Sequence, residues 1–538
     1  MVIRSKAERE TSERQKRIQS TLERLGIGRP DRPETVVDPF WTEPNILILG
    51  NRGSGKTVGL KCWALNFATL RKGMLIYLDR PGSAVRDLAG HFSASGFEDR
   101  TWLINARDVK RTLQWPFISE ITSTDPVEIE RDESQVTDEL MEACYGRRNV
   151  KSGETKPYTT DYAVAAIKLF ARIAKRPNIR FLRDVWLPSL LPMHEWLMGQ
   201  SLNRNAVSLF RDAEERRIRS PADYEISAGA GKRLLQPLWS SVIYPHDGNT
   251  ISWEQAGQDQ ALVLVDLSGV SFDDARSLGI LIQSAVLSAV RRHFYKTGKP
   301  LPVTFVLEEC GRMGFATPAI IGACQEMRQY GVSVAFCSQT HLDFSDETAF
   351  EQIMGLCQVH IFYHLDSGIE RCAADLANPQ YDPMREHSRT KRAIPIGQQV
   401  IETFSKGERS DGSKDERIGQ SFVTQYEYVE DVKYMTADMQ EQQYRTDLSR
   451  LETFERFVKD HSGVRREKVI PLRPAWALGL SEDRTEAAIQ RILSRPEYQP
   501  VNDKLPDLTM PPVSGGAIAS PIDDELTRLL LHGNGTRP

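Results

Sequence analysis

The sequence predicts an α/β protein with a mostly parallel sheet and an inserted all-α domain. Short apolar runs of strand length alternate with helical patterns in two blocks, near residues 45–105 and 261–363. This alternation is typical of parallel sheets with helical crossovers. Residues 123–238, between the blocks, have mainly helical periodicity. The 538 residues, 40% of them hydrophobic and 26% charged, are enough to bury a large core.

The first block contains a strand, a Gly-rich turn and a helix in direct succession. The strand Asn45 to Leu49 is entirely apolar after its first residue, and the helix runs from about Lys56 to Leu70 before Gly73 breaks the pattern. The other elements expected here are the strand Met74 to Leu78, the helix Val85 to Phe92 and the strand Thr101 to Asn105.

The second block resumes the sheet pattern after the helical middle. Its expected strands are Ala261 to Asp266, Val303 to Leu307, Val332 to Phe336 and Val359 to Tyr363, and its main helices are Asp273 to Phe294 and Ile320 to Tyr330. Further along, we expect a mobile loop at Ser405 to Ser421, a strand at Phe422 to Tyr428, and a helix from a Thr cap at Thr436 to Lys459.

These elements divide the chain into five parts. They are a charged N-terminal segment (1–35), a first core half with the Gly-rich loop (36–122), the all-α insertion (123–245), a second core half (246–464) and a flexible C-terminal tail (465–538). The seven scattered cysteines form no CxxC pair, which fits reduced thiols in the cytoplasm. No apolar run approaches the ~20 residues of a membrane span.

The Gly-rich loop matches the phosphate-binding pattern GxxxxGK[ST] as Gly50-Asn51-Arg52-Gly53-Ser54-Gly55-Lys56-Thr57. Glycines let backbone N–H groups converge on phosphate oxygens, and the N-terminus of the following helix favours the same anion. Lys56 would reach the β- and γ-phosphates, and the Thr57 hydroxyl would bind Mg²⁺. The sequence therefore predicts ATP and Mg²⁺ as cofactors.

Hydrolysis also needs an acidic group, which we expect on a strand that neighbours the loop strand. Glu308 and Glu309 follow the apolar run Val303 to Leu307. In the preferred reading Glu308 holds Mg²⁺ through water and Glu309 polarises the attacking water. Asp266, after another apolar strand, is the alternative acid. Gln339, just past a third strand, could sense the γ-phosphate or be a solvated loop amide.

The stretch Val303 to Phe344 resembles the type IV secretion coupling proteins of the TraG/TraD group. The resemblance lies in a hydrophobic strand, an acidic pair, a nearby Gly, a helix ending in Arg and a strand ending in Gln. In this chain these features are Glu308-Glu309, Cys310, Gly314, Arg328 and Gln339. Looser matches at Leu75 to Leu88 and Ala261 to Gly269 extend the resemblance over about Pro44 to Lys459.

The resemblance implies a RecA-like P-loop motor core that forms a homohexamer, with ATP at subunit interfaces and single-stranded DNA in the channel. Arg328 would be the arginine finger that reaches a neighbour's nucleotide. The partners implied are a relaxase–DNA complex (the relaxosome) and the proteins of a secretion channel. The family usually has N-terminal transmembrane helices. A variant without them would be cytoplasmic and reach the bacterial inner membrane only through a partner.

A second departure is Glu308, where the family usually has Asp. The additional methylene puts full hydrolytic activity in question, so a nucleotide-binding adaptor with weak hydrolysis is one alternative. The other is a HerA/FtsK-like translocase that processes DNA outside secretion. Two basic clusters could grip DNA phosphates, recognise cargo or be solvated helix faces. They are Arg147, Arg148, Lys151 and Lys156, and Arg216, Arg217 and Arg219.

Overall fold

The fold was analysed in a computed structural model of the chain. The residues that the structure describes are mainly 45–70, 73–106, 252–344, 347–377, 383–408, 414–461, 463–469 and 482–495. Residues 1–34 of the charged N-terminal segment lie outside them, as do most of the predicted all-α insertion, the cluster Arg147 to Lys156 and the end of the tail. None of the described helices is sufficiently long and apolar to cross a membrane.

Within the described residues, ten strands form one sheet in the order β1-β12-β11-β8-β2-β7-β6-β3-β5-β4. All pairs from β8 to β4 are parallel, and β11 is antiparallel to both of its neighbours. The bounds are β1 Thr35–Val36, β2 Asn45–Leu49, β3 Met74–Asp79, β4 Thr101–Asn105, β5 Leu262–Asp266, β6 Val303–Leu307, β7 Val332–Ser338, β8 Val359–Phe362, β11 Glu455–Asp460 and β12 Gly463–Val469. The predicted α/β fold with a mostly parallel sheet is confirmed.

Helices pack against the sheet because its central strands are apolar on both faces. All five residues of β2 and of β6 are buried, which is the pattern of a strand covered on each side. The covering helices are α2 Lys56–Leu70, α3 Ser83–Ala94, α10 Trp253–Gln258, α11 Phe272–Thr297, α13 Pro318–Glu326 and α14 Glu347–Leu356. α11 begins at a Ser271 side-chain cap and ends where Gly298 turns left-handed, so its caps fix both of its ends.

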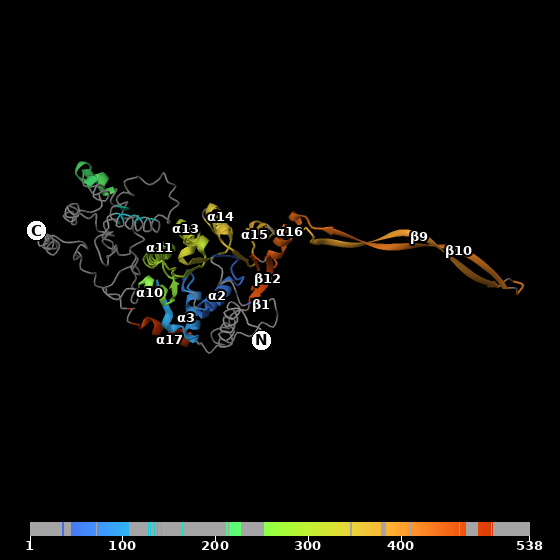
Figure 1. Cartoon of the computed structure of the whole chain (residues 1–538), viewed down its shortest axis with the longest axis horizontal. Helices are drawn as coiled ribbons and strands as arrows, with labels where there is room; N and C mark the ends of the chain where they lie inside the picture. Colours follow the sequence, from blue (N-terminus) through green and yellow to red (C-terminus); the bar gives the residue numbers. More distant parts are fainter. Residues whose placement is uncertain are drawn as a thin grey trace, which may run out of the picture. The chain divides into compact units, whose positions relative to one another are not determined.

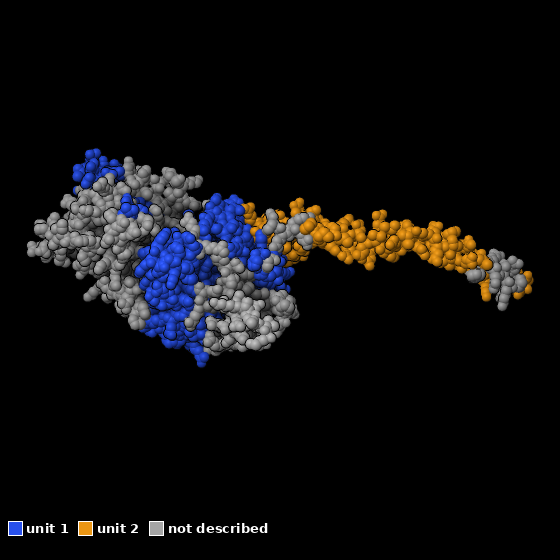
Figure 2. All heavy atoms as spheres, viewed as in Figure 1, with its two compact units in different colours: residues 1–367, 451–538 blue, residues 368–450 orange. Residues whose placement is uncertain are grey.

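The chain divides into two compact units, residues 1–367 with 451–538, and residues 368–450 (Figure 2). The second unit contains α15 Ile369–Ala377, α16 Ala437–Leu448 and a hairpin of β9 Glu386–Glu408 and β10 Lys414–Tyr434. The mobile loop expected at Ser405 to Ser421 is therefore wrong, because residues 405–408 and 414–421 belong to β9 and β10, and only residues 410–412 of this segment are described as a turn. Most hairpin side chains are exposed on both faces, so its strands carry no alternation of buried and exposed residues.

The helix expected to run from Thr436 to Lys459 ends much earlier. Its Thr436 cap is present, accepting a hydrogen bond from the backbone N–H of Met439, but α16 stops at Leu448. The chain then enters β11, where Phe457 and Val458 are buried against β8. Pairing with the sheet edge replaces the continuing helix because it buries these two side chains.

Part of the segment expected to be a flexible tail is ordered structure. β12 extends the sheet, and α17 Glu482–Leu493 packs on α3 and β4 through Ile489, Ile492 and Leu493. The Tyr498 hydroxyl accepts a hydrogen bond from the backbone N–H of Leu103 at 2.5 Å. Composition alone missed this helix because its apolar residues occupy a single stripe.

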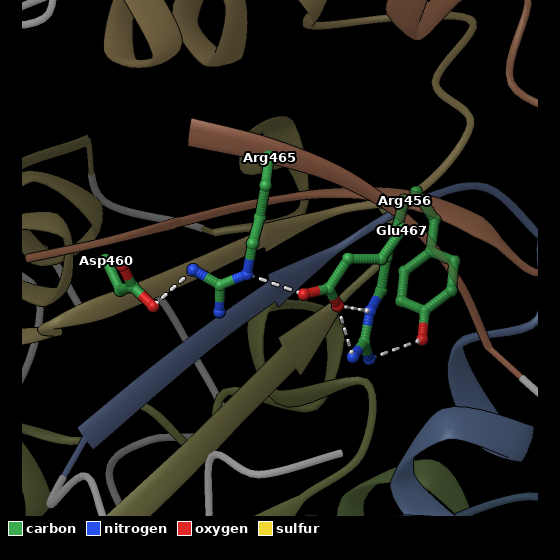
Figure 3. A network of polar contacts seen from close by, with 5 residues as sticks. Arg456, Asp460, Arg465 and Glu467 are labelled. Atoms are coloured by element: carbon green, nitrogen blue, oxygen red, sulfur yellow. Dashed lines mark hydrogen bonds and ion pairs between the residues drawn. The ribbon is translucent and has the colours of Figure 1, made fainter. Parts of the chain in front are cut away.

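A buried ion-pair network joins β11 and β12 (Figure 3). Arg456 is 1% exposed and Glu467 is 4% exposed, and the Arg456 Nη2 donates to Glu467 Oε2 at 3.0 Å. Arg465 donates to the other oxygen of Glu467 at 2.6 Å and to Asp460. Tyr363 accepts from the Arg456 Nη1 at 3.4 Å. The network stabilises the buried guanidinium of Arg456 next to α2, the helix that follows the P-loop.

Replacing Glu467 with Gln is expected to lower the free energy of unfolding by about 3–5 kcal/mol, because it leaves the buried Arg456 charge without its counter-ion. Urea denaturation of both proteins measures the difference. The matched control is Glu455→Gln, which breaks a pair with the half-exposed Arg466 and should cost about 1 kcal/mol or less. Equal effects of the two substitutions would contradict the prediction.

Candidate nucleotide-binding site

The P-loop connects β2 to α2 with a backbone that two glycines make possible. Gly53 has φ 82° and Gly55 has φ 104°, both in the left-handed region. A Cβ at Gly55 would lie 2.7 Å from Cδ1 of Phe454, so no larger residue fits there. The loop therefore has the compact form that lets backbone N–H groups converge on an anion.

Three neighbouring segments hold the loop in place through backbone hydrogen bonds. The Gly50 N–H donates to the Gln339 carbonyl at 3.0 Å, and the Asn51 N–H donates to the His364 carbonyl at 2.8 Å. On the other side, the Phe454 N–H donates to the Ser54 carbonyl at 3.0 Å. The loop is thus fixed by the ends of β7 and β8 and by the segment before β11.

The side chains of the loop fit a bound phosphate. The Ser54 hydroxyl is buried and has no hydrogen-bond partner among the described residues, which leaves it available to an anion oxygen. The Lys56 ammonium group is nearly buried and donates to the carbonyls of Gly50 and, at 3.0 Å, Asn51. Both groups lie at the N-terminus of α2, where negative charge is favoured. Arg52 and Gly53 are exposed at the mouth of the loop.

Glu308 lies directly after β6 and reaches the first turn of α2. One of its carboxylate oxygens accepts a hydrogen bond from the Thr57 hydroxyl, and the other accepts from the Tyr77 hydroxyl at 3.0 Å. The structure thus brings together the two oxygen donors, Thr57 and Glu308, that the sequence assigned to Mg²⁺. Oxygen ligands of this kind suit that ion. Burial raises the pKa of Glu308, while the hydrogen bonds from Thr57 and Tyr77 partly offset this effect.

The acidic strand is not adjacent to the P-loop strand, which corrects the expectation of a neighbouring strand. β7 stands between β2 and β6 in the sheet. Glu308 nevertheless contacts Thr57, so the longer side chain of Glu fits this position. The alternative acid, Asp266, ends β5, which lies four strands from β2, and its carboxylate accepts from the Ser268 N–H at 2.8 Å. Asp266 therefore lies away from Thr57.

Glu309 and Gln339 contact each other across the ends of β6 and β7. The Gln339 Nε2 donates to Glu309 Oε1 at 3.1 Å. Glu309 has φ 55° and ψ 36°, a left-handed conformation that is costly for a residue with a side chain and that clusters at functional sites. Asp343 holds the Gln339 loop, since its Oδ2 accepts from the Gln339 and Thr340 N–H groups and from the Ser338 hydroxyl.

A cavity of about 680 Å³ opens beside the phosphate loop. It is lined by Arg52, Gly53, Ser54, His364, Leu451, Glu452, Thr453, Phe454 and Lys468. Phe454, with φ 72°, is, after Glu309, a second non-glycine residue of this site in the left-handed region. The cavity has an apolar wall at Leu451 and Phe454 and charged groups at its rim. Its size and lining fit a ligand that extends from the loop.

Asp79 ends β3 as a second buried carboxylate, besides Glu308, near this edge of the sheet. Burial, together with the charge of Glu308, raises the pKa of Asp79 from 3.8 to about 7. Its Oδ2 accepts from the Ala84 and Val85 N–H groups at the start of α3. Because the folded protein holds this proton more tightly than the unfolded chain, stability falls as the pH rises from about 4 to 7 and is level with respect to this group above 7.

Asp79→Asn is expected to remove that slope. A difference of three pKa units corresponds to roughly 4 kcal/mol. The free energy of unfolding of the variant minus that of the wild type should therefore increase by roughly this amount between pH 4 and pH 7. Urea denaturation at several pH values tests this. Asp99→Asn, at an exposed position in η2 Glu98–Arg100, is the control. A difference between Asp79→Asn and wild type that stays constant with pH would refute the prediction.

Arg328 lies away from this site within the same chain. It belongs to η6 Met327–Tyr330, just before β7 begins at Val332, whereas Gln339 follows the opposite end of that strand. Seven residues of strand span roughly 20 Å. Its side chain is not among those described. Of the basic clusters, only Arg216, Arg217 and Arg219 are described, and Arg219 pairs with Glu215 at 3.4 Å.

Sequence reasoning missed Tyr77, Asp343 and Phe454. A Tyr within the buried run Met74 to Leu78 was a usable signal, because a buried hydroxyl needs a partner. The Thr340-x-x-Asp343 spacing was another, since it matches a capping box, which the structure contains. Phe454 gave no such signal, because its segment was expected to be helical.

The fold and this loop define the class of protein as an α/β P-loop NTPase fold. Solved structures of the conjugative coupling protein TrwB have the same fold. The unbound bacterial TrwBΔN70 is 13% identical with a TM-score of 0.51, and TrwB in complex with ADP and Mg²⁺ is 14% identical with a TM-score of 0.52. Each match covers 84% of this chain and 92% of the other. TrwB in complex with a non-hydrolysable ATP analogue matches equally well. No family model and no curated protein matches the sequence.

Proposed function

We propose that this protein is an ATP-hydrolysing DNA translocase that acts as a coupling protein, linking a relaxase–DNA substrate to a type IV secretion channel. The observation that carries the proposal is the convergence of Lys56, Thr57, Glu308, Glu309 and Gln339 at one edge of a sheet that shares the fold of TrwB. TrwB has been solved with ADP and Mg²⁺ and with an ATP analogue, which supports the same cofactors here.

Each group has a role that its position supports. The backbone of the loop, Ser54 and Lys56 bind the phosphates, while Thr57 and Glu308 would hold Mg²⁺, which neutralises charge on the β- and γ-phosphates. Glu309 would take a proton from the attacking water, and Gln339, which donates a hydrogen bond to Glu309, would orient that water. The cavity beside Phe454 would take the base and ribose.

The contact between Glu308 and Thr57 favours hydrolysis over a nucleotide-binding adaptor, because the acid reaches the residue expected to share its metal ion. Arg328, at the far end of β7 from its own nucleotide site, would complete the site of a neighbouring subunit in a homohexamer. The proposed ring holds single-stranded DNA in its channel and contacts the membrane only through a partner.

ATP turnover with and without single-stranded DNA tests the proposal. We expect DNA to stimulate turnover several-fold, with less effect from the polyanion heparin at equal charge, and Arg328→Ala to abolish the stimulated rate. Turnover that is identical with and without DNA would overturn the translocase. If single-stranded DNA stimulates turnover but the protein does not bind a relaxase–DNA complex, the result would instead favour a HerA/FtsK-like translocase outside secretion.

A further inference from the structure

The β9–β10 hairpin is a long ribbon without a covering layer in its own unit. Its second strand alone has 21 residues, or roughly 70 Å. Among the described residues, β9 and β10 pair only with each other (Figure 1). Two-stranded hairpins are at best marginally stable by themselves in water, and three or more strands with an apolar face are needed. The ribbon therefore lacks the layer that such a structure normally requires.

Exposed apolar side chains lie on both faces of the ribbon, and the most exposed ones of β10 share one face. Ile418, Phe422, Tyr426 and Tyr428 are an even number of residues apart in β10, so they share a face, and they are 54–69% exposed. Val400, directly opposite Phe422 in β9, adds to the same face. Isolated exposed apolar residues need no explanation, but several large ones on one face, here with Gln420 and Thr424 between them, mark an interaction surface.

The two outer edges of the ribbon differ. β9 contains Pro395, and the pairing register shifts there, between Gln425 and Tyr426 of β10. Proline and bulges obstruct the addition of another strand. β10 has no proline, and its residues 418–426 form a nine-residue run without a charge. The edge of β10 thus lacks the features that normally prevent strand addition.

The charges that flank this run favour pairing with a second copy of β10. Arg417 precedes it and Glu427 follows it, at equal distances from its centre, Phe422. If two copies of β10 paired antiparallel about Phe422, Arg417 of each would lie opposite Glu427 of the other, and Ile418 opposite Tyr426. Matched charges and aromatic–aliphatic pairs directly opposite each other are stabilising.

Neighbouring registers are worse. Successive residues of a strand point their N–H groups to alternate edges. One β10 strand can therefore shift along the other only by an even number of residues. The next register in one direction brings Asp415 opposite Asp431, and in the other it brings Asp415 opposite Glu427. Like charges directly opposite each other are destabilising. The charge pattern therefore favours the register centred on Phe422.

We propose that β10 is a self-association edge, which pairs with β10 of a second copy of this chain about a two-fold axis at Phe422 to form a four-stranded sheet. Each ribbon supplies two further strands to the other, and Ile418, Phe422 and Tyr426 of one copy meet their apolar counterparts across the junction. The interface is isologous, because the same strand serves on both sides. It does not depend on nucleotide hydrolysis.

Disulfide trapping in the full-length protein tests the register. Phe422→Cys places the two thiols opposite each other, with Cβ atoms about 5 Å apart, which is close to disulfide geometry. Gln420→Cys is the matched control, because it is exposed on the same face but its two copies lie about 13 Å apart along the strands. Wild type sets the background, since its six described cysteines are all buried.

We expect Phe422→Cys to form covalent dimers at least tenfold faster than Gln420→Cys under mild oxidation. Arg417→Glu and Glu427→Arg should each reduce Phe422→Cys trapping, and the two together should restore it. Adding Lys56→Ala should leave trapping unchanged, which separates this result from any failure of the proposed function. Equal trapping at 420 and 422, or a ribbon that binds another protein or DNA but not its copy, overturns the proposal.

Discussion

Lys56→Ala is expected to lower the rate of ATP hydrolysis by about 10²- to 10³-fold, as loss of one preorganised charge-stabilising group at a reaction centre does. Lys56 lies at the start of α2, nearly buried, with its ammonium group against the loop carbonyls of Gly50 and Asn51. No other lysine or arginine in the described part of the P-loop is buried there. We also expect weaker ATP binding, because the same charge faces the phosphates.

The matched control is Lys61→Ala, one turn and a half further along the same helix. Lys61 pairs with the half-exposed Asp87 at 2.7 Å and faces away from the loop. Its loss should leave hydrolysis within about twofold of wild type, because an ion pair of this kind contributes at most about 1 kcal/mol. Steady-state phosphate release and titration with a fluorescent ATP analogue measure both effects. Equal turnover of Lys56→Ala and Lys61→Ala would contradict the assignment of Lys56 to the phosphate-binding site.

Glu309→Gln should separate binding from chemistry. We expect turnover to fall by about 10²- to 10⁴-fold, the usual contribution of a positioned general base, while ATP affinity stays within about threefold of wild type. The reason is geometric: Glu309 follows β6 and contacts Gln339, and it is not part of the loop proposed to hold the phosphates. The amide keeps the shape of the side chain but cannot accept a proton from water.

Glu347→Gln, at an exposed position in α14, is the control for a lost surface carboxylate and should not change turnover. Single-turnover phosphate release combined with equilibrium ATP binding distinguishes the two effects. A Glu309→Gln protein that hydrolyses ATP at the wild-type rate would transfer the role of base to another group. A variant that loses affinity as much as Lys56→Ala would instead place Glu309 in ground-state binding.

The core could be predicted from the sequence where local patterns and long-range structure agree. The apolar strands from β2 to β8 are buried on both faces, so continuous runs such as Asn45 to Leu49 predict them directly. The P-loop could be recognised because glycine positions, Lys56 and Thr57 follow from the geometry of phosphate binding. Contacts such as that of Glu308 with Thr57 depend on strand order, and local patterns do not specify that order.

The errors came from segments whose structure depends on distant partners. Residues 449–459 continue a helical pattern, but Phe457 and Val458 gain more by burial against β8. The β9–β10 hairpin is exposed on both faces and has no alternation of burial to detect. α17 has the charged composition of a tail, and only its stripe on α3 makes it part of the core.

The two walls of the cavity beside the phosphate loop come from distant parts of the sequence. Arg52, Gly53 and Ser54 emerge from the ribosome about 400 residues before Leu451, Phe454 and Lys468. At 5–20 residues per second this delay is roughly 20–80 s. During that time the nascent chain carries the phosphate loop without its opposing wall. The complete cavity can form only after residues 451–468 have been synthesised, which would keep shorter nascent chains from binding the proposed nucleotide with full affinity.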